Sequence, residues 1–113
     1  MQSYQLVIRV SEPVSLTVGK LGVFEFPVGE YIYTGSAKRH LEARIRRHLR
    51  TTKTLKWHID YLLAHPAVAV VDVIRSTVPE CELNQQTAGE ILIPRFGASD
   101  CRSGCISHLK YRK

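Results

Sequence analysis

The sequence lacks any long run of hydrophobic residues. Its longest apolar stretches, such as Ala67–Val71, are far shorter than the roughly 20 residues that a membrane-crossing helix needs. The first residues, Met1 to Tyr4, also lack the basic, apolar and small-residue order of a signal peptide. These two absences argue against a membrane protein or membrane partner and predict a cytoplasmic location.

Cysteines are few, and their number is odd. Three cysteines cannot pair evenly, and a reducing compartment argues against a disulfide framework, so they are expected to be thiols or metal ligands. Internal repeats, low-complexity runs and linkers are absent as well. With 113 residues, 44% hydrophobic and 23% charged, the chain is expected to form one globular domain over residues 1–113.

Acidic residues are scarce in one part of the chain. Half of the 16 basic residues fall between Lys38 and Lys56, where Glu42 is the only acid, and the chain carries a formal charge of +6. Such a basic patch is typical of a protein that binds a polyanion, because neutralising phosphates releases condensed counterions. A merely solvated basic helix is the alternative.

The hydrophobic pattern changes period near the middle of the chain. Alternation over Tyr4–Val10 predicts a strand, and β-rich runs separated by glycines predict an antiparallel meander over Ser15–Val18, Val23–Pro27 and Glu30–Thr34. From Ser36, the expected N-cap, apolar residues recur every four positions and predict a helix with Ala37, Leu41, Ile45 and Leu49 on its buried stripe.

The second half predicts two more helices and a strand. The expected elements are a helix over Leu55–Ala64, a buried strand over Ala67–Ile74, a helix over Glu80–Ile91 and a turn-rich tail from Leu92. The predicted fold class is therefore mixed α+β (α/β in the broad sense). A mainly antiparallel central sheet is flanked by about three helices.

The first predicted helix carries its arginines on two sides. At 100° per residue, Arg44 and His48 flank the apolar stripe. The other arginines are expected to point away from it and, with Lys38, to contact DNA phosphates; they are Arg39, Arg46, Arg47 and Arg50.

Three segments resemble the GIY-YIG nuclease superfamily. Tyr33-Thr34-Gly35 ends a predicted strand, and Arg44 and His48 follow one turn apart on the next helix, as in that family. Gln2-Ser3-Tyr4 is similar to the family's first motif, Gly-Ile-Tyr, with only the tyrosine kept. Thr34 also replaces an isoleucine, and Tyr4 and Tyr33 stand 29 positions apart, farther than in the family, which predicts an additional hairpin.

Further agreement suggests the small, free-standing Uri-type branch of this superfamily, so that the resemblance covers nearly the whole chain. It rests on Trp57–Leu63, Glu80–Leu83, Phe96–Cys101 and Ser107–Leu109. The resemblance implies a metal-dependent endonuclease that acts on DNA, with RNA as an alternative substrate. It also implies a catalytic set of Tyr4, Tyr33, Arg44, His48 and a metal-binding glutamate, for which Glu82 is the best match and Glu80 the reserve.

Residue chemistry supports these roles. The guanidinium of Arg44 suits the charge that develops on a phosphate, and one Glu82 carboxylate suffices for Mg²⁺ or Mn²⁺, which prefer oxygen ligands. Tyr4 or Tyr33 assists water activation only if a neighbouring cation or metal lowers its pKa, and the sequence does not choose between them.

Each assignment has a structural alternative. The two tyrosines also suit packing in a sheet, Arg44 a helix surface, His48 a satisfied, partly buried position, and Glu82 a first-turn acid that complements the helix dipole. Trp57, His58 and Tyr61 are interpreted as core and rim of a helix and are left out of the catalytic set.

The cysteines suggest a second, structural metal. Cys81, Cys101, Cys105 and His108 supply three sulfurs and one imidazole, a ligand set that suits tetrahedral Zn²⁺.

The function hypothesis from the sequence as a whole is a DNA endonuclease. The alternatives are a catalytically degenerate nucleic-acid-binding module and a zinc-stabilised interaction domain.

Overall fold

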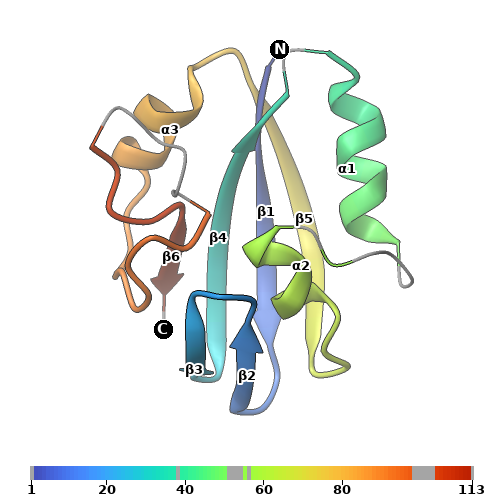
Figure 1. The fold of residues 1–113 in the computed structure, drawn as a ribbon. Coiled ribbons are helices and arrows are strands. Elements are labelled where there is room, and N and C mark those ends of the chain that lie inside the picture. The colour runs from blue at the N-terminus through green and yellow to red at the C-terminus, as the bar shows by residue number, and fades with distance from the viewer. Residues whose placement is uncertain (1, 38, 51–54, 56, 98–103, 113) are drawn as a thin grey trace.

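A four-stranded antiparallel sheet forms the centre of the molecule (Figure 1). The computed structural model describes residues 2–37, 39–50, 55, 57–97 and 104–112. Strand β1 (Ser3–Val10) pairs with β4 (Gly29–Ser36) on one side and with β5 (Val68–Ser76) on the other, and β6 (Leu109–Arg112) continues the sheet beyond β4. This confirms the mixed α+β class and the antiparallel sheet.

The strand over Tyr4–Val10 is confirmed and supplies the centre of the core. Successive side chains of a strand point to opposite faces, so Tyr4, Leu6, Ile8 and Val10 share one face, and all four are buried. The same core cluster contains Ile45 of α1 (Leu41–Leu49) and Ile59 and Leu62 of α2 (His58–Leu63). Helices α1 and α2 therefore close the core over this face of the sheet.

Helix α3 (Glu80–Gln86) and the residues after it cover the other face. Gln5 of β1 donates a hydrogen bond to Thr87 Oγ1 at 2.7 Å, and Lys110 Nζ of β6 donates to the backbone oxygens of Asn84 and Thr87, both at 3.0 Å. In the described part of the chain, three helices thus flank the sheet, as expected. Among the described residues, no helix is long and apolar enough to cross a membrane.

The expected meander is only partly correct. Strands β2 (Val14–Val18) and β3 (Gly22–Phe26) form the additional hairpin, but they pair with each other in a separate two-stranded sheet. Strand β4 instead pairs with β1, in a register that places Tyr4 opposite Gly35 and Leu6 opposite Tyr33. The hairpin is therefore an insertion between the two central strands.

The first helix begins later than predicted, and its buried face is rotated. Ser36 is the last residue of β4 and not an N-cap; α1 is preceded by His40, whose φ of 57° is left-handed. Ala37 is buried outside the helix. Ile45 is buried as expected, but Leu49 is 50% exposed and His48 only 2% exposed, so a histidine takes the place predicted for the leucine.

The second half shows four differences from the sequence prediction. Helix α2 is shorter at both ends, and α3 ends at Gln86, where Thr87 N donates to Asn84 O. Strand β5 lies at the edge of the sheet, so Val71 and Ile74 of a strand predicted to be buried are exposed. The predicted turn-rich tail contains strand β6, whose pairing with β4 is a tertiary contact that local pattern does not reveal.

Candidate active site

Tyr4 lies at the centre of a cluster formed by β1, β4 and α1. Its hydroxyl is 2.7 Å from Nε2 of His48, and its ring centroid lies 6.5 Å from that of Tyr33 and 5.5 Å from that of His48. The three rings are buried, with exposures of 1% for Tyr4, 7% for Tyr33 and 2% for His48. The structure therefore brings together two strand tyrosines and the helix histidine that the sequence singled out.

Gly35 is what allows Tyr4 to occupy this position. A Cβ atom at residue 35 would lie 2.5 Å from both the Cζ atom and the hydroxyl of Tyr4, closer than real Cβ contacts. Because glycine alone lacks this atom, the Tyr4 ring crosses directly over the backbone of β4. The glycine of the Tyr33-Thr34-Gly35 motif is thus a packing requirement of the tyrosine on the neighbouring strand.

Arg44 is held in the same cluster from α1. Its Nη1 donates a hydrogen bond to the backbone oxygen of Ser36 at 2.7 Å, and its guanidinium lies 4.8 Å from the ring centroid of Trp57. Burial raises the pKa of Tyr4 well above its ordinary value, although the charge and a hydrogen bond of Arg44 partly offset this effect. Arg44 is therefore fixed near the tyrosine hydroxyl and is not a free surface charge.

Tyr33 lies beside Tyr4 on the side of the cluster that contacts Gly97. Burial raises the pKa of Tyr33 above its ordinary value, and the negative charge of an ionised Tyr4 would raise it further. Its ring packs against Gly97, where a Cβ atom would lie 2.9 Å from Tyr33 Cε1. Of the two tyrosines that the sequence left open, Tyr4 is the one with a short polar contact to His48 and a hydrogen bond to Arg44.

The carboxylate that reaches the cluster belongs to Glu80, which was the second choice from the sequence, after Glu82. Ser36 Oγ donates to Glu80 Oε1 at 2.6 Å, and Nδ1 of His108 lies 2.8 Å from Glu80 Oε2. Positions 80 and 82 of a helix differ by about 200° in direction, so Glu82 points away and is exposed. The structure thus places Glu80, and not Glu82, next to the cluster, and metal binding by either glutamate stays a prediction.

Glu80 is charged at neutral pH. Burial raises the pKa of Glu80, whereas the side-chain contacts with His108 and Ser36 lower it. The charges of His108 and Arg44 lower the pKa further, so that it lies below the ordinary value. A half-buried carboxylate is thereby kept negative beside Tyr4 and Arg44, which both interact with its charge.

Arg47 does not belong with the outward arginines. Its Nη1 and Nη2 atoms donate to the two carboxylate oxygens of Asp60 at 2.9 and 3.0 Å, and Asp60 is completely buried. Asp60 Oδ2 also accepts a hydrogen bond from Trp57 N at 2.9 Å, and the Arg47 guanidinium lies 4.3 Å from the Trp57 ring centroid. Arg47 therefore fastens α1 to α2, and the prediction that it points outward is wrong.

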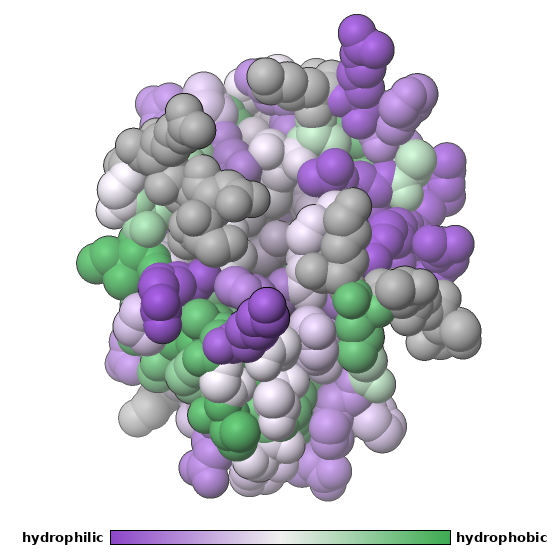
Figure 2. All heavy atoms as spheres, viewed as in Figure 1, coloured by the Kyte–Doolittle hydropathy of each residue, from purple (hydrophilic) through white to green (hydrophobic). Residues whose placement is uncertain are grey.

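The remaining arginines expected to contact DNA are exposed. Figure 2 shows hydrophilic side chains gathered over α1, where Arg46 is exposed, with Arg39 before the helix and Arg50 after it. An open hollow on this surface is lined by Ala43, Arg46, Arg47, Leu49 and Arg50. Lys38, the other residue expected to contact DNA, lies outside the described residues.

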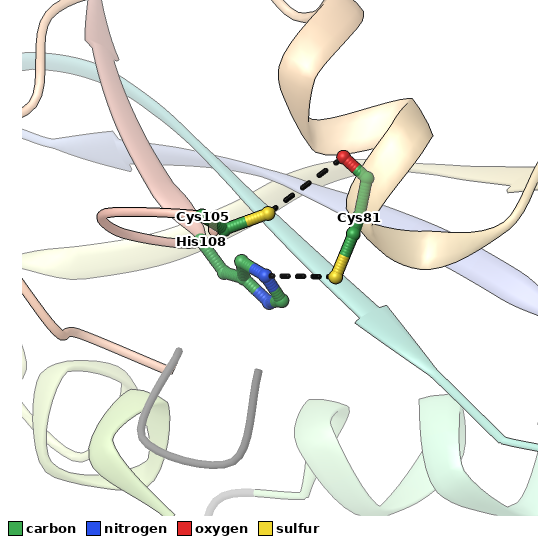
Figure 3. Close-up of side chains that lie close together, drawn as sticks. All are labelled: Cys81, Cys105 and His108. Atoms are coloured by element: carbon green, nitrogen blue, oxygen red, sulfur yellow. Dashed lines mark hydrogen bonds between the residues drawn. The ribbon is translucent and has the colours of Figure 1, made fainter. Parts of the chain in front are cut away.

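Three of the four residues predicted to bind zinc also come together. The ligand atoms of Cys81, Cys105 and His108 all lie within 4.8 Å of one another (Figure 3). The fourth, Cys101, lies outside the described residues.

Sequence reasoning missed two residues that position the cluster. Ser36 forms hydrogen bonds with both Arg44 and Glu80. The ring of Trp57 makes cation–π contacts with both Arg44 and Arg47. Ser36 was interpreted as an N-cap and Trp57 as a core residue, and neither pattern signals these contacts. Asn84 is buried and lies four residues after Glu80, so the two side chains share one face of α3. Because both residues are polar, they form no hydrophobic stripe that would indicate this face in the sequence.

Comparison with protein families places this arrangement in a family context. The model described as "Domain of unknown function DUF123" matches residues 3–113. The chain belongs to the DUF123 family. The match includes every residue of the cluster, from Tyr4 to His108. The chain has no significant match among curated proteins or solved structures.

Proposed function

We propose that this DUF123 protein is a metal-dependent endonuclease that hydrolyses DNA phosphodiester bonds and is related to the GIY-YIG nucleases, in their Uri-type branch. One observation carries the proposal: Tyr4, Arg44, His48 and Glu80, far apart in the sequence, meet in one cluster beside the basic surface of α1. A shared site for tyrosine, arginine, histidine and glutamate suits phosphodiester hydrolysis better than it suits a purely structural core.

Arg44 is proposed to stabilise the negative charge that develops on the phosphate oxygens. Its fork of donors is held by Ser36 O and by the Trp57 ring, so little rotational freedom remains to be lost when a phosphate arrives. A lysine at this position offers a point charge without the planar fork. We therefore expect the arginine to be specifically required.

Tyr4 and His48 are proposed to move the proton of the attacking water as a pair. Burial raises the pKa of Tyr4, so a free tyrosinate is disfavoured at neutral pH. The 2.7 Å contact gives another route, in which Tyr4 accepts the water proton while its own proton passes to the unprotonated Nε2 of His48. Tyr33 packs against both rings and is proposed to position them.

Glu80 is proposed to hold the divalent cation, Mg²⁺ or Mn²⁺, in place of Glu82. Its carboxylate is charged, is half-buried and is an oxygen donor, which fits a hard cation that often takes only one or two protein carboxylates. When bound, such a cation lowers the pKa of a coordinated water and neutralises charge on the phosphate. Ser36 orients the carboxylate through its hydrogen bond, and His108 does so through the 2.8 Å contact of its Nδ1.

DNA is proposed to bind across the outer surface of α1. Arg39, Arg46 and Arg50 are exposed there and suit contacts to backbone phosphates, which carry no sequence information. The same surface suits RNA, which is the alternative substrate. A cytoplasmic setting fits this proposal, because a reducing compartment keeps Cys81 and Cys105 from forming a disulfide.

A catalytically degenerate nucleic-acid-binding module is the second candidate function. The observation that favours it is the near-complete burial of Tyr4, at 1% exposure, and of His48, at 2%. Both side chains are shielded from solvent, whereas Arg39, Arg46 and Arg50 are exposed and can contact phosphate without a change in the cluster.

The deciding experiment incubates the purified protein with labelled duplex, branched and single-stranded DNA, with Mg²⁺, with Mn²⁺ or with chelator. Arg44→Ala is expected to lower cleavage by about 10² while leaving much of the DNA affinity, as for other removed transition-state donors. Arg9→Ala, at an exposed position on β1, is the matched control and is expected to cleave like the parent. Tight DNA binding without cleavage under any metal would replace this proposal with the binding module.

A further inference from the structure

Two thiols and one imidazole converge at the end of the molecule where α3 approaches β6. Cys81 comes from the first turn of α3, whereas Cys105 and His108 come from the segment that leads into β6 (Figure 3). Cys81 Sγ lies 3.8 Å from Nε2 of His108, and Cys105 Sγ lies 3.8 Å from the backbone oxygen of Cys81. None of the proposed catalytic steps uses these three ligand atoms.

The spacing of these atoms is close to that of a tetrahedral zinc site. With Zn–S near 2.3 Å and Zn–N near 2.05 Å, a tetrahedral ion separates sulfur from nitrogen by about 3.6 Å and two sulfurs by about 3.8 Å. The observed sulfur to Nε2 distance is 3.8 Å, and every pair lies within 4.8 Å. Side-chain rotations that close the widest pair by up to about 1 Å complete the geometry.

The orientation of His108 is that of a metal ligand. Its Nε2 faces Cys81, while its Nδ1 lies 2.8 Å from Glu80 Oε2, and the side chain is 3% exposed. A ligating histidine usually donates its other ring N–H to a carboxylate, which fixes the tautomer and raises the basicity of the ligating nitrogen. Gln85 similarly donates to Cys105 Sγ at 3.7 Å, a contact that favours a thiolate.

We propose that Cys81, Cys105 and His108 bind one Zn²⁺ ion that fastens α3 to the segment preceding β6. Two thiolates and an imidazole are soft and borderline donors that select zinc, whereas the oxygen donors of Glu80 suit magnesium or manganese. A fourth coordination position remains for water or another ligand. This site is separate from the proposed catalytic metal, and its existence does not depend on nuclease activity.

The fold supplies a reason for such a fastening. Helix α3 has seven residues, and Asn84 is its only buried residue, so hydrophobic packing holds it weakly. Its polar contacts to β6 and to the segment before it include hydrogen bonds from Asn84 Nδ2 to Ser107 O at 2.7 Å and from Lys110 Nζ to Asn84 O at 3.0 Å. A metal that joins Cys81 to residues 105 and 108 stabilises this polar contact against local unfolding.

A Cys81–Cys105 disulfide is the competing use of the same thiols. Their sulfur atoms lie within 4.8 Å, and oxidation removes both thiolates from the metal. Zinc and disulfide therefore exclude each other, and a thiol count in chelator and denaturant without reductant distinguishes them, because chelation releases zinc-bound thiolates but leaves a disulfide intact.

The test begins with the full chain purified under reducing conditions without added metal. Elemental analysis is expected to give about one zinc per chain, and chelation is expected to lower the Tm. Cys81→Ser, Cys105→Ser and His108→Gln are each expected to lose most of the zinc and the Tm response to chelator. Gln86→Ser, at an exposed position on the same helix, is the matched control and is expected to retain both.

Cobalt substitution keeps the proposal falsifiable if the ligand variants fail to fold. Adding Co²⁺ to the metal-free parent is expected to produce a thiolate-to-cobalt charge-transfer band and the visible absorption of a tetrahedral ion, both removed by excess Zn²⁺. Absence of zinc together with absence of that band would overturn the proposal. So would zinc retained by all three ligand variants, or a parent whose Cys81 and Cys105 form a disulfide and that stays metal-free after reduction.

Discussion

Glutamine substitution of the two glutamates at the start of α3 tests which of them binds the catalytic metal. The structure favours Glu80, whereas the sequence favoured Glu82. Glu80→Gln and Glu82→Gln remove the same charge from the same helix, and both lie in its first turn, so effects on the helix dipole are matched. They differ in surroundings, because Glu80 binds Ser36 and His108 whereas Glu82 is exposed. Different outcomes for the two variants therefore report on those contacts.

The stability cost of Glu80→Gln follows from its two polar contacts, the hydrogen bond from Ser36 and the 2.8 Å contact with Nδ1 of His108. Glutamine re-forms them at best as neutral bonds, which contribute about 1–1.5 kcal/mol less each than bonds to a charged group. The Glu80 side chain is 26% exposed, so solvent screening reduces the total to about 1–2 kcal/mol. For a domain of this size, Tm falls by roughly 4–8 °C. Glu82→Gln is a surface change, expected to alter stability by no more than about 0.5 kcal/mol.

Thermal unfolding and DNA cleavage are the two measurements. Glu80→Gln is also expected to reduce cleavage by about 10², with partial recovery at higher Mg²⁺ or in Mn²⁺, because an amide is a weaker ligand for a hard cation. Glu82→Gln is expected to cleave like the parent. Equal melting temperatures together with equal cleavage rates would refute the role of Glu80, and a larger cleavage loss in Glu82→Gln would restore the sequence assignment.

Three further predictions concern the binding surface, the strand glycine and the buried tyrosines. Charge reversal of Arg39, Arg46 and Arg50 to glutamate is expected to weaken DNA binding across sequences and flatten its salt dependence in fluorescence anisotropy; unchanged affinity at low salt would remove α1 from the interface. Gly35→Ala is expected to displace the Tyr4 ring, because its Cβ would lie 2.5 Å from that side chain, and to lower cleavage as much as Tyr4→Phe does; parental cleavage and Tm would contradict this. Burial raises the pKa of Tyr4, Tyr31 and Tyr33 above the ordinary 10, so the unfolded chain releases these protons at lower pH than the folded chain does. The free energy of unfolding therefore falls as pH rises above 10, by up to about 1.4 kcal/mol per pH unit for each tyrosine. Chemical denaturation at several alkaline pH values measures this slope, which Tyr33→Phe is expected to reduce; an unchanged slope would show that Tyr33 ionises in the folded state.

Hydrophobic pattern was sufficient for elements whose burial follows hydrophobicity. The alternation over Tyr4–Val10 predicted β1 because its even positions are apolar and buried. The same logic misplaced the face of α1, since His48 is buried and Leu49 half-exposed. A buried histidine is tolerated because the Tyr4 hydroxyl matches its ring nitrogen at 2.7 Å, and that partner lies 44 positions away. No local pattern contains this information.

The part of the candidate site that could be predicted consists of motif residues on strands and helices, where the secondary structure determines which way each side chain points. Tyr4, Tyr33, Arg44 and His48 meet because the β1–β4 register and the facing of α1 aim them at one point. Arg47 was misassigned because its partner, Asp60, lies on another helix, and an arginine is outward only where no buried acid faces it. The sequence could not decide between Glu80 and Glu82, because α3 is short and polar and has no hydrophobic stripe to show which side faces the sheet.

The segment that leads into the last described strand, β6, is part of the candidate site through His108. Its backbone oxygen accepts a hydrogen bond from Thr34 N at 3.0 Å, which attaches it to the strand of the tyrosine motif, and its ring contacts Glu80. Glu80 is adjacent to Cys81, so the proposed oxygen-donor and sulfur-donor metals would be separated by one histidine ring. Zinc on Nε2 would leave the proton on Nδ1 and keep it directed at the Glu80 carboxylate. The proposed structural metal would therefore fix the orientation of the proposed catalytic ligand, and removing zinc should weaken Mg²⁺ binding even where the protein stays folded.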